Sequence, residues 1–248
     1  MFTLKWTEEV LKETKKLTKL LVDICHSQIL HNDNNHHPMD MIGTAECWDA
    51  PDGEKDLQFK IIHEAGISDK DSILDIGCGN ADFYRYLKTQ RWDGHYLGID
   101  PGECILSVDE SINTLRCTIE DLDETKYDWV IANAIFDLTL VSPVVTTPTT
   151  NVDRFNPEFG PNKSKAWINI VCNLISEENS LRIIDNMISR ANKGVVFNMI
   201  QVSHHMGHET DMKSYWIYNK LLKYNHNGIK IIEDYMKNDR EFMVYFYV

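Results

Sequence analysis

Residues 72–83 read SILDIGCGNADF, and this stretch decides the fold. The pattern predicts a buried strand over residues 72–76, a turn at Gly77 and Gly79, and a helix that starts at Ala81. About twenty residues further on, the stretch HYLGID predicts a second buried strand that ends in Asp100. In a doubly wound α/β fold, an acidic residue at the end of the second strand binds a ribose through its hydroxyl groups. The two strands and the turn therefore predict a nucleoside-binding α/β domain.

The charges around the glycine turn narrow the class of ligand. Asp75 lies near the end of the first strand, and Asp82 stands at the third glycine position of the dinucleotide-binding pattern G-x-G-x-x-G. Two carboxylates beside the turn repel a pyrophosphate, but they suit a ligand with a ribose, an adenine, an ammonium group and no phosphate. S-adenosylmethionine (SAM) has this composition. A turn that binds no ligand remains the alternative.

The same segment resembles the first motif of the class I SAM-dependent methyltransferases, which reads D/E-x-G-x-G-x-G. Asp75, Gly77 and Gly79 match it, and Ala81 stands where the family usually has its third glycine. Residues 194–200, GVVFNMI, also resemble a strand of the form G-V-x-F-N in small phage- or bacterial-type methyltransferases. The resemblance implies SAM as the cofactor and methyl transfer as the activity.

Alternating strand and helix patterns continue to the end of the chain. Further strands are expected over residues 114–118, 129–132, 195–200, 229–234 and 242–248, and helices over 54–65, 81–90, 165–175, 179–191 and 212–224. The short polar stretch between the last two strands allows an antiparallel hairpin. We therefore predict an α/β, doubly wound, seven-stranded, mostly parallel sheet with an antiparallel last strand, plus an N-terminal helical extension.

Two parts of the chain stand apart from this alternation. Residues 1–68 are expected to form an N-terminal extension, with a helix over 7–30 and a polar loop over 31–53. Residues 69–248 form the predicted SAM-binding methyltransferase domain, in which the Thr-, Pro- and Asn-rich segment 142–164 is an inserted loop or lid.

Composition excludes several classes of partner. The formal net charge of −13 makes DNA an unexpected partner, because nucleic-acid binding needs a basic face. The six cysteines form no C-x-x-C pair, and no apolar run is long enough to span a bilayer. We expect reduced thiols, a cytoplasmic location, no membrane partner and no metal site; the sequence does not give the oligomeric state.

Four segments at strand ends supply the candidate cofactor-binding residues. Asp100 is expected to accept hydrogen bonds from the ribose hydroxyls, with Pro101 beside the sugar, although a turn or capping role is the alternative for Asp100. The resemblance implies that Asp121 and Leu122 contact the adenine and that Asn133 contacts the methionine part or the substrate. The full set of cofactor-binding candidates is Asp75, Gly77, Gly79, Asp100, Pro101, Asp121, Leu122 and Asn133.

Catalytic residues are weakly marked, because SAM already carries an activated leaving group and the protein mainly aligns the reactants. His204, His205 and Asp137 are candidates for a general base. The chain lacks the Asn-Pro-Pro-Tyr motif of DNA amino-methyltransferases and the Pro-Cys pair of cytosine C5 enzymes.

The function predicted from sequence is SAM-dependent methyl transfer to a small-molecule acceptor by direct displacement. A non-catalytic SAM-binding module and a protein or RNA methyltransferase remain as alternatives. An NAD-dependent oxidoreductase is disfavoured by Asp82.

Overall fold

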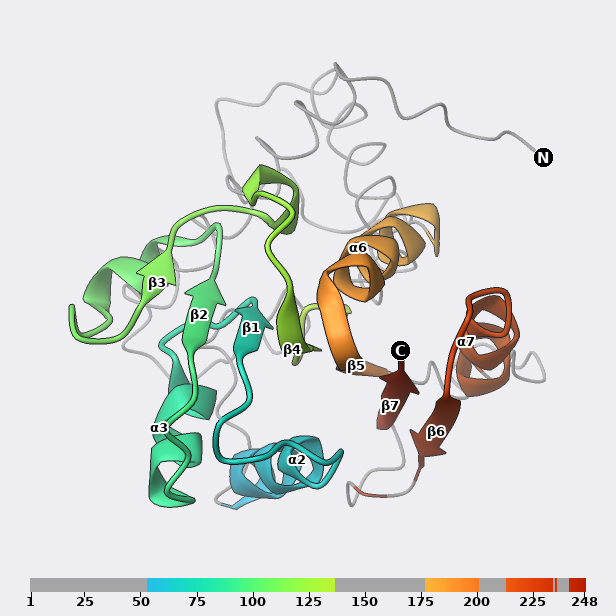
Figure 1. Ribbon diagram of the computed structural model, residues 1–248, viewed down its shortest axis with the longest axis horizontal. Helices are drawn as coiled ribbons and strands as arrows, with labels where there is room; N and C mark the ends of the chain where they lie inside the picture. Colours follow the sequence, from blue (N-terminus) through green and yellow to red (C-terminus); the bar gives the residue numbers. More distant parts are fainter. Residues whose placement is uncertain (1–52, 137–176, 201–212, 234, 236–240) are drawn as a thin grey trace, which may run out of the picture.

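A computed structural model describes residues 53–136, 177–200, 213–233, 235 and 241–248, and within these the sheet has seven strands (Figure 1). The strands are β1 (Ile73–Ile76), β2 (Tyr96–Ile99), β3 (Thr114–Leu115), β4 (Tyr127–Ala132), β5 (Ala191–Ile200), β6 (Gly228–Ile232) and β7 (Glu241–Tyr247). The helices are α2 (Glu54–His63), α3 (Asp82–Thr89), α6 (Glu177–Arg190) and α7 (Lys213–Leu221), with the short 3₁₀ helices η1 (Glu103–Ser107) and η2 (Ile119–Asp121).

The strand order is β3-β2-β1-β4-β5-β7-β6. Strands β1 to β5 pair in parallel, and β7 runs antiparallel to both β5 and β6. The chain moves outward from β1 to β3 and then returns to place β4 on the other side of β1. This reversal creates a switch point at the carboxyl ends of β1 and β4, where open α/β sheets bind their ligands. The predicted fold class, including the antiparallel last strand, is confirmed.

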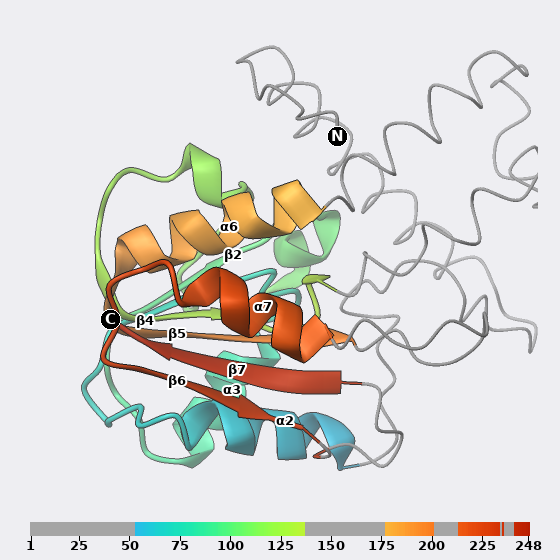
Figure 2. The same cartoon turned by 90° about the vertical axis from the view of Figure 1, so that its right-hand side faces the viewer.

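The sheet lies between two helical layers (Figure 2). Helices α6 and α7 cover one face and bury Ile184, Met187, Ile217 and Leu221 against it. Helices α2 and α3 cover the other face, and their side chains join Trp129 and Tyr245 in a second apolar cluster. Every residue of β1 and β2 is buried, as expected for parallel strands that are covered on both faces.

The third strand is shorter than the sequence predicts. It ends at Leu115 and not at Thr118, because the amide of Cys117 turns back to donate to the carbonyl of Leu115 (3.1 Å). Thr118 then caps η2. A strand at the edge of the sheet has one neighbour, so a local turn competes with its pairing more easily than in the centre.

Helix α2 lies inside the segment predicted as an N-terminal extension. Its residues Phe59, Ile61 and Ile62 are buried in the same cluster as Phe83 and Leu87 of α3, so α2 is part of the packed core. The predicted helices over 7–30 and 165–175 lie outside the described residues. Among the residues that are described, no helix is long and apolar enough to cross a membrane.

Candidate cofactor site

The glycine turn after β1 contains three left-handed residues. Gly77, Gly79 and Ala81 have φ angles of 71°, 50° and 60°. These are the three positions of the G-x-G-x-G pattern, so the motif follows from the backbone conformation of the turn. Left-handed residues other than glycine are uncommon, and strained ones gather at functional sites.

Ala81 provides a stability test of this conformation. Its methyl group is fully buried, and so is that of Ala65, whose φ is not positive. Relief of left-handed strain, about 1–2 kcal/mol, should offset the lost methyl group in Ala81→Gly but not in Ala65→Gly. We therefore expect urea unfolding to show Ala81→Gly near wild-type stability and Ala65→Gly clearly less stable. Equal losses in the two variants would mean that Ala81 is not strained.

Four backbone amides of the turn, those of Gly77, Cys78, Gly79 and Ala81, donate to acceptors within the protein. The amides of Gly77 and Cys78 donate to the carbonyl of Ile99 (2.8 and 3.0 Å), that of Ala81 donates to the carbonyl of Cys78 (2.8 Å), and that of Gly79 donates to Asp100. Dinucleotide-binding turns offer such amides to phosphate oxygens. This turn uses them to hold itself against the end of β2, which disfavours a phosphate-bearing ligand.

Asp100 lies where the sequence predicts, at the end of β2, and is buried. One carboxylate oxygen accepts the amide of Gly79 (3.1 Å) and the other accepts the amide of Gly102 (2.7 Å). Asp100 therefore ties the glycine turn to the second strand. Each oxygen can accept further donors, so this structural role is compatible with ribose binding. The carbonyl of the adjacent Pro101 accepts a hydrogen bond from Nε of Arg116 (3.2 Å).

Asp75 lies in the buried strand β1 and accepts a hydrogen bond from the hydroxyl of Tyr96 (2.6 Å). Burial raises the pKa of its carboxyl from 3.8 to about 7, although the Tyr96 hydrogen bond opposes this, and the charges of Asp100 and Asp82 raise the pKa further. The unfolded chain ionises this group near pH 4. The stability that Asp75 contributes is therefore complete below that pH and is lost as the pH rises through 7.

We expect Asp75→Asn to remove this loss. At pH 8 the variant should exceed the wild type in unfolding free energy by up to about 4 kcal/mol, and the two should converge below about pH 4. Urea unfolding across this pH range measures the difference. Parallel profiles for the two proteins would show that the Asp75 carboxyl ionises normally in the folded state.

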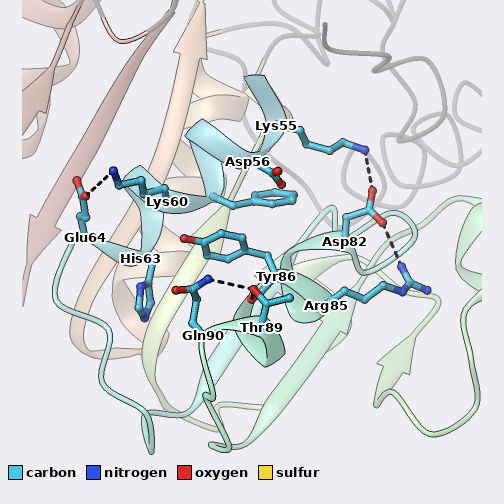
Figure 3. Close-up of a pocket in the computed structure, with 11 residues that line it drawn as sticks. Lys55, Asp56, Lys60, His63, Glu64, Asp82, Arg85, Tyr86, Thr89 and Gln90 are labelled. Carbon is cyan, nitrogen blue, oxygen red and sulfur yellow. Dashed lines mark hydrogen bonds and ion pairs between the residues drawn. The ribbon is translucent and has the colours of Figure 1, made fainter. Parts of the chain in front are cut away.

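The structure corrects the prediction that the negative charge of Asp82 repels a pyrophosphate. Its carboxylate pairs with Lys55 of α2 (2.7 Å) and with Arg85 of α3 (3.1 Å), at one end of a groove of about 740 Å³ between these helices (Figure 3). The charge of Asp82 is therefore compensated, so this carboxylate repels a pyrophosphate much less than an unpaired one would. A dinucleotide is disfavoured instead because amides of the glycine turn are already bonded to acceptors within the protein.

The predicted adenine contacts lie at the end of η2, with Asp121 as its last residue and Leu122 as its C-cap. Asp121 is exposed, and its carboxylate accepts the amide (3.0 Å) and the hydroxyl (2.8 Å) of Thr118. The bond from the Thr118 amide is one half of a capping box, whose other half runs from the amide of Asp121 to the side chain of Thr118. Leu122 is half-buried against the core. Both residues follow β3 along the chain, and their contact with adenine stays a prediction; the sequence analysis did not foresee that Asp121 takes part in capping η2.

Asn133, Ala134 and Ile135 follow β4 at the switch point. A Cβ placed on Gly77 would lie 2.2 Å from the side chain of Ile135, so this segment packs directly on the glycine turn. Ala134 has a φ of 62°, and its amide donates to the side chain of Asn198 in β5 (2.6 Å). A second strained residue thus lies at the mouth of the site.

A buried polar network beside Asn133 was not predicted from the sequence. It joins Asn133 to Gln58 of α2, and Gln58 and Asn198 to Glu241 of β7. These residues are 183 positions apart along the chain at most, and no local motif marks them.

The candidate bases His204, His205 and Asp137 lie outside the described residues, as do the segments 142–164 and 31–52. Within the described ranges, no group of three or more potential ligands could hold a metal ion.

Comparison with known proteins identifies the fold. The magnesium protoporphyrin IX methyltransferase of Synechocystis PCC 6803 with bound SAM is 12% identical, covers 99% of each chain and gives a TM-score of 0.50. The same enzyme with bound SAH, S-adenosylhomocysteine, is 11% identical over 94% of this chain and 98% of that one, with a TM-score of 0.51. This chain has the class I methyltransferase fold. No protein-family model matches the sequence, and no curated protein matches it either.

Proposed function

We propose that this protein binds SAM at the carboxyl ends of β1, β2 and β4 and transfers its methyl group to a small-molecule acceptor. The observation that carries the proposal is the glycine turn, whose three left-handed residues are tied through Gly79 to Asp100. The fold, shared with an enzyme solved with SAM, supports the same reading.

The polar groups of the site suit a ligand that carries an amino acid and no phosphate. The side-chain oxygens of Asn80 and Asn133 are buried and have no hydrogen-bond partner among the described residues. Both are acceptors, so they match the N–H groups of an ammonium and not phosphate oxygens. In this proposal Asp100 holds the ribose with Pro101 beside it, Asp121 and Leu122 border the adenine, and Asn133 faces the methionine part. Asp75, Gly77 and Gly79 shape the turn.

When bound, SAM supplies a sulfonium leaving group, so the methyl transfer needs alignment more than acid–base chemistry. The rigid contact of Ile135 with Gly77 holds the end of β4 against the turn and fixes the geometry there. A base from His204, His205 or Asp137 would remove a proton from the acceptor. The net charge of −13 favours a small molecule over RNA as the acceptor.

Methyl-labelled SAM tests the activity. We expect the purified protein to transfer label to the small-molecule fraction of a cell extract, and Asp100→Ala to reduce the transfer at limiting SAM. Label in the protein or RNA fraction instead would support the alternative class of acceptor. Tight SAM binding without transfer to any fraction would indicate a non-catalytic SAM-binding protein.

A further inference from the structure

A chain of partly buried side-chain hydrogen bonds runs from the start of β7 to the residue after β4. Nε2 of Gln58 donates to Glu241 (3.0 Å), and Oε1 of Gln58 accepts from Nδ2 of Asn133 (3.2 Å). Gln58 is fully buried in the face of α2 that packs on the sheet. The chain therefore connects a carboxylate at the start of β7 to a side chain at the switch point.

The Glu241 carboxylate sets the orientation of each amide in this network. It accepts hydrogen bonds from Gln58, from Nδ2 of Asn198 (3.1 Å) and from the hydroxyl of Tyr235 (3.0 Å). All three bonds end on the same oxygen, Oε2 of Glu241, as an acceptor, so Gln58 presents its NH₂ group to Glu241 and its oxygen to Asn133. Asn133 must then use its NH₂ group on Gln58, which leaves its oxygen as the free end of the chain.

The unpaired side-chain oxygen of Asn133 indicates which kind of ligand group this site accepts. It is buried and finds no donor among the described residues, and an unsatisfied buried acceptor destabilises the folded protein. The amide dipoles between it and Glu241 are aligned, so each hydrogen bond strengthens the next and makes this oxygen a better acceptor. The group that satisfies it must donate a hydrogen bond, and a positive charge on that group increases the gain.

We propose that Gln58 and Glu241 are positioning residues that hold the Asn133 oxygen to accept a hydrogen bond from an amine or ammonium group. The inference rests on the proposed function and adds a ligand chemistry to it. Two molecules bring such a group to this edge of the sheet: the amino-acid part of the cofactor and an amine acceptor. The same oxygen serves either one.

Calorimetry with two nucleosides separates these sources. SAH carries the amino-acid part, whereas 5′-methylthioadenosine has the same nucleoside and thioether without it. Gln58→Met keeps the size of the side chain and removes its hydrogen bonds to Glu241 and Asn133. If the cofactor supplies the ammonium, we expect the SAH dissociation constant to rise about tenfold and that of methylthioadenosine to stay unchanged. If the acceptor supplies it, neither constant changes and label transfer from SAM to amines of the extract falls about tenfold.

Two further variants sharpen the test. Gln90→Met makes the same substitution at an exposed position, the C-cap of α3, where the side chain donates to the hydroxyl of Thr89 (3.0 Å), and should change nothing. Glu241→Gln keeps an acceptor but removes the charge, so it should give a smaller loss of the same kind, and it carries the test if Gln58→Met does not fold. If SAH and methylthioadenosine bind more weakly by the same factor, or if neither binding nor label transfer changes, the inference is wrong. Failure of the proposed function would appear separately, as a wild-type protein that does not bind SAH.

Discussion

Gly77→Val is expected to lower the free energy of unfolding by about 3–5 kcal/mol and to abolish cofactor binding. Two effects combine at this residue. A φ of 71° places the side chain in the left-handed region, which a β-branched residue strongly avoids. The first carbon of that side chain would also overlap Ile135, at 2.2 Å from its Cγ2 atom. The sequence suggests a clash with the ligand, but the structure shows that the clash begins within the protein.

Gly53→Val separates the two effects. Gly53 has a φ of 92°, and among the residues that the structure describes no atom lies within 4 Å of the position its Cβ would take. Its substitution should therefore show only the conformational cost, about 1–2 kcal/mol. Urea unfolding of both variants measures the difference. Equal destabilisation would show that Ile135 moves away at little cost and that the end of β4 is not packed rigidly on the turn.

Asp100→Ala is expected to weaken SAH binding roughly 10- to 100-fold, since hydrogen bonds to a charged group contribute about 1.5–3 kcal/mol. The variant loses the proposed ribose acceptor and also the two bonds that tie Gly79 and Gly102 in place. Its stability should therefore fall as well. Calorimetry at a temperature where the variant is folded isolates the binding effect from the loss of stability.

Asp109→Ala is the matched control for Asp100. Asp109 is an exposed aspartate that accepts the amide of the residue two positions later, Ser111 (2.8 Å), as Asp100 does with Gly102. Its loss removes a similar turn contact away from the end of β2 and should leave SAH affinity unchanged. If both variants bind SAH as the wild type does, Asp100 is a structural residue of the turn and not a ribose ligand.

The fold was predictable because its signals are local. The strand, turn and helix around Gly77 follow one another within twelve residues, and the period of the apolar residues changes where the structure changes. The early end of β3 was not predictable, because the pairing of an edge strand depends on competing turn geometry and not on apolar residues. The positions of Asp100 and Asn133 at strand ends were predictable to the same extent, whereas their contacts with a cofactor stay predictions.

The polar network was not predictable, because its members come from α2, β4, β5 and β7 and meet only in the folded chain. Asn198 stands within a stretch that otherwise reads as an apolar strand, and Gln58 lies on a helix face among apolar residues, whereas Glu241 ends the polar stretch before the last predicted strand. A buried polar residue in an apolar pattern is the one signal in the sequence that points to them. The compensation of Asp82 by Lys55 was hidden for the same reason.

Calorimetric titration of the wild-type protein with SAM, SAH and NAD tests the central claim most directly. We expect saturable, one-to-one binding of SAM and SAH and no binding of NAD, because four amides of the glycine turn, those of Gly77, Cys78, Gly79 and Ala81, are bonded within the protein and do not face a phosphate. Tight binding of NAD without a signal for SAM or SAH would contradict it.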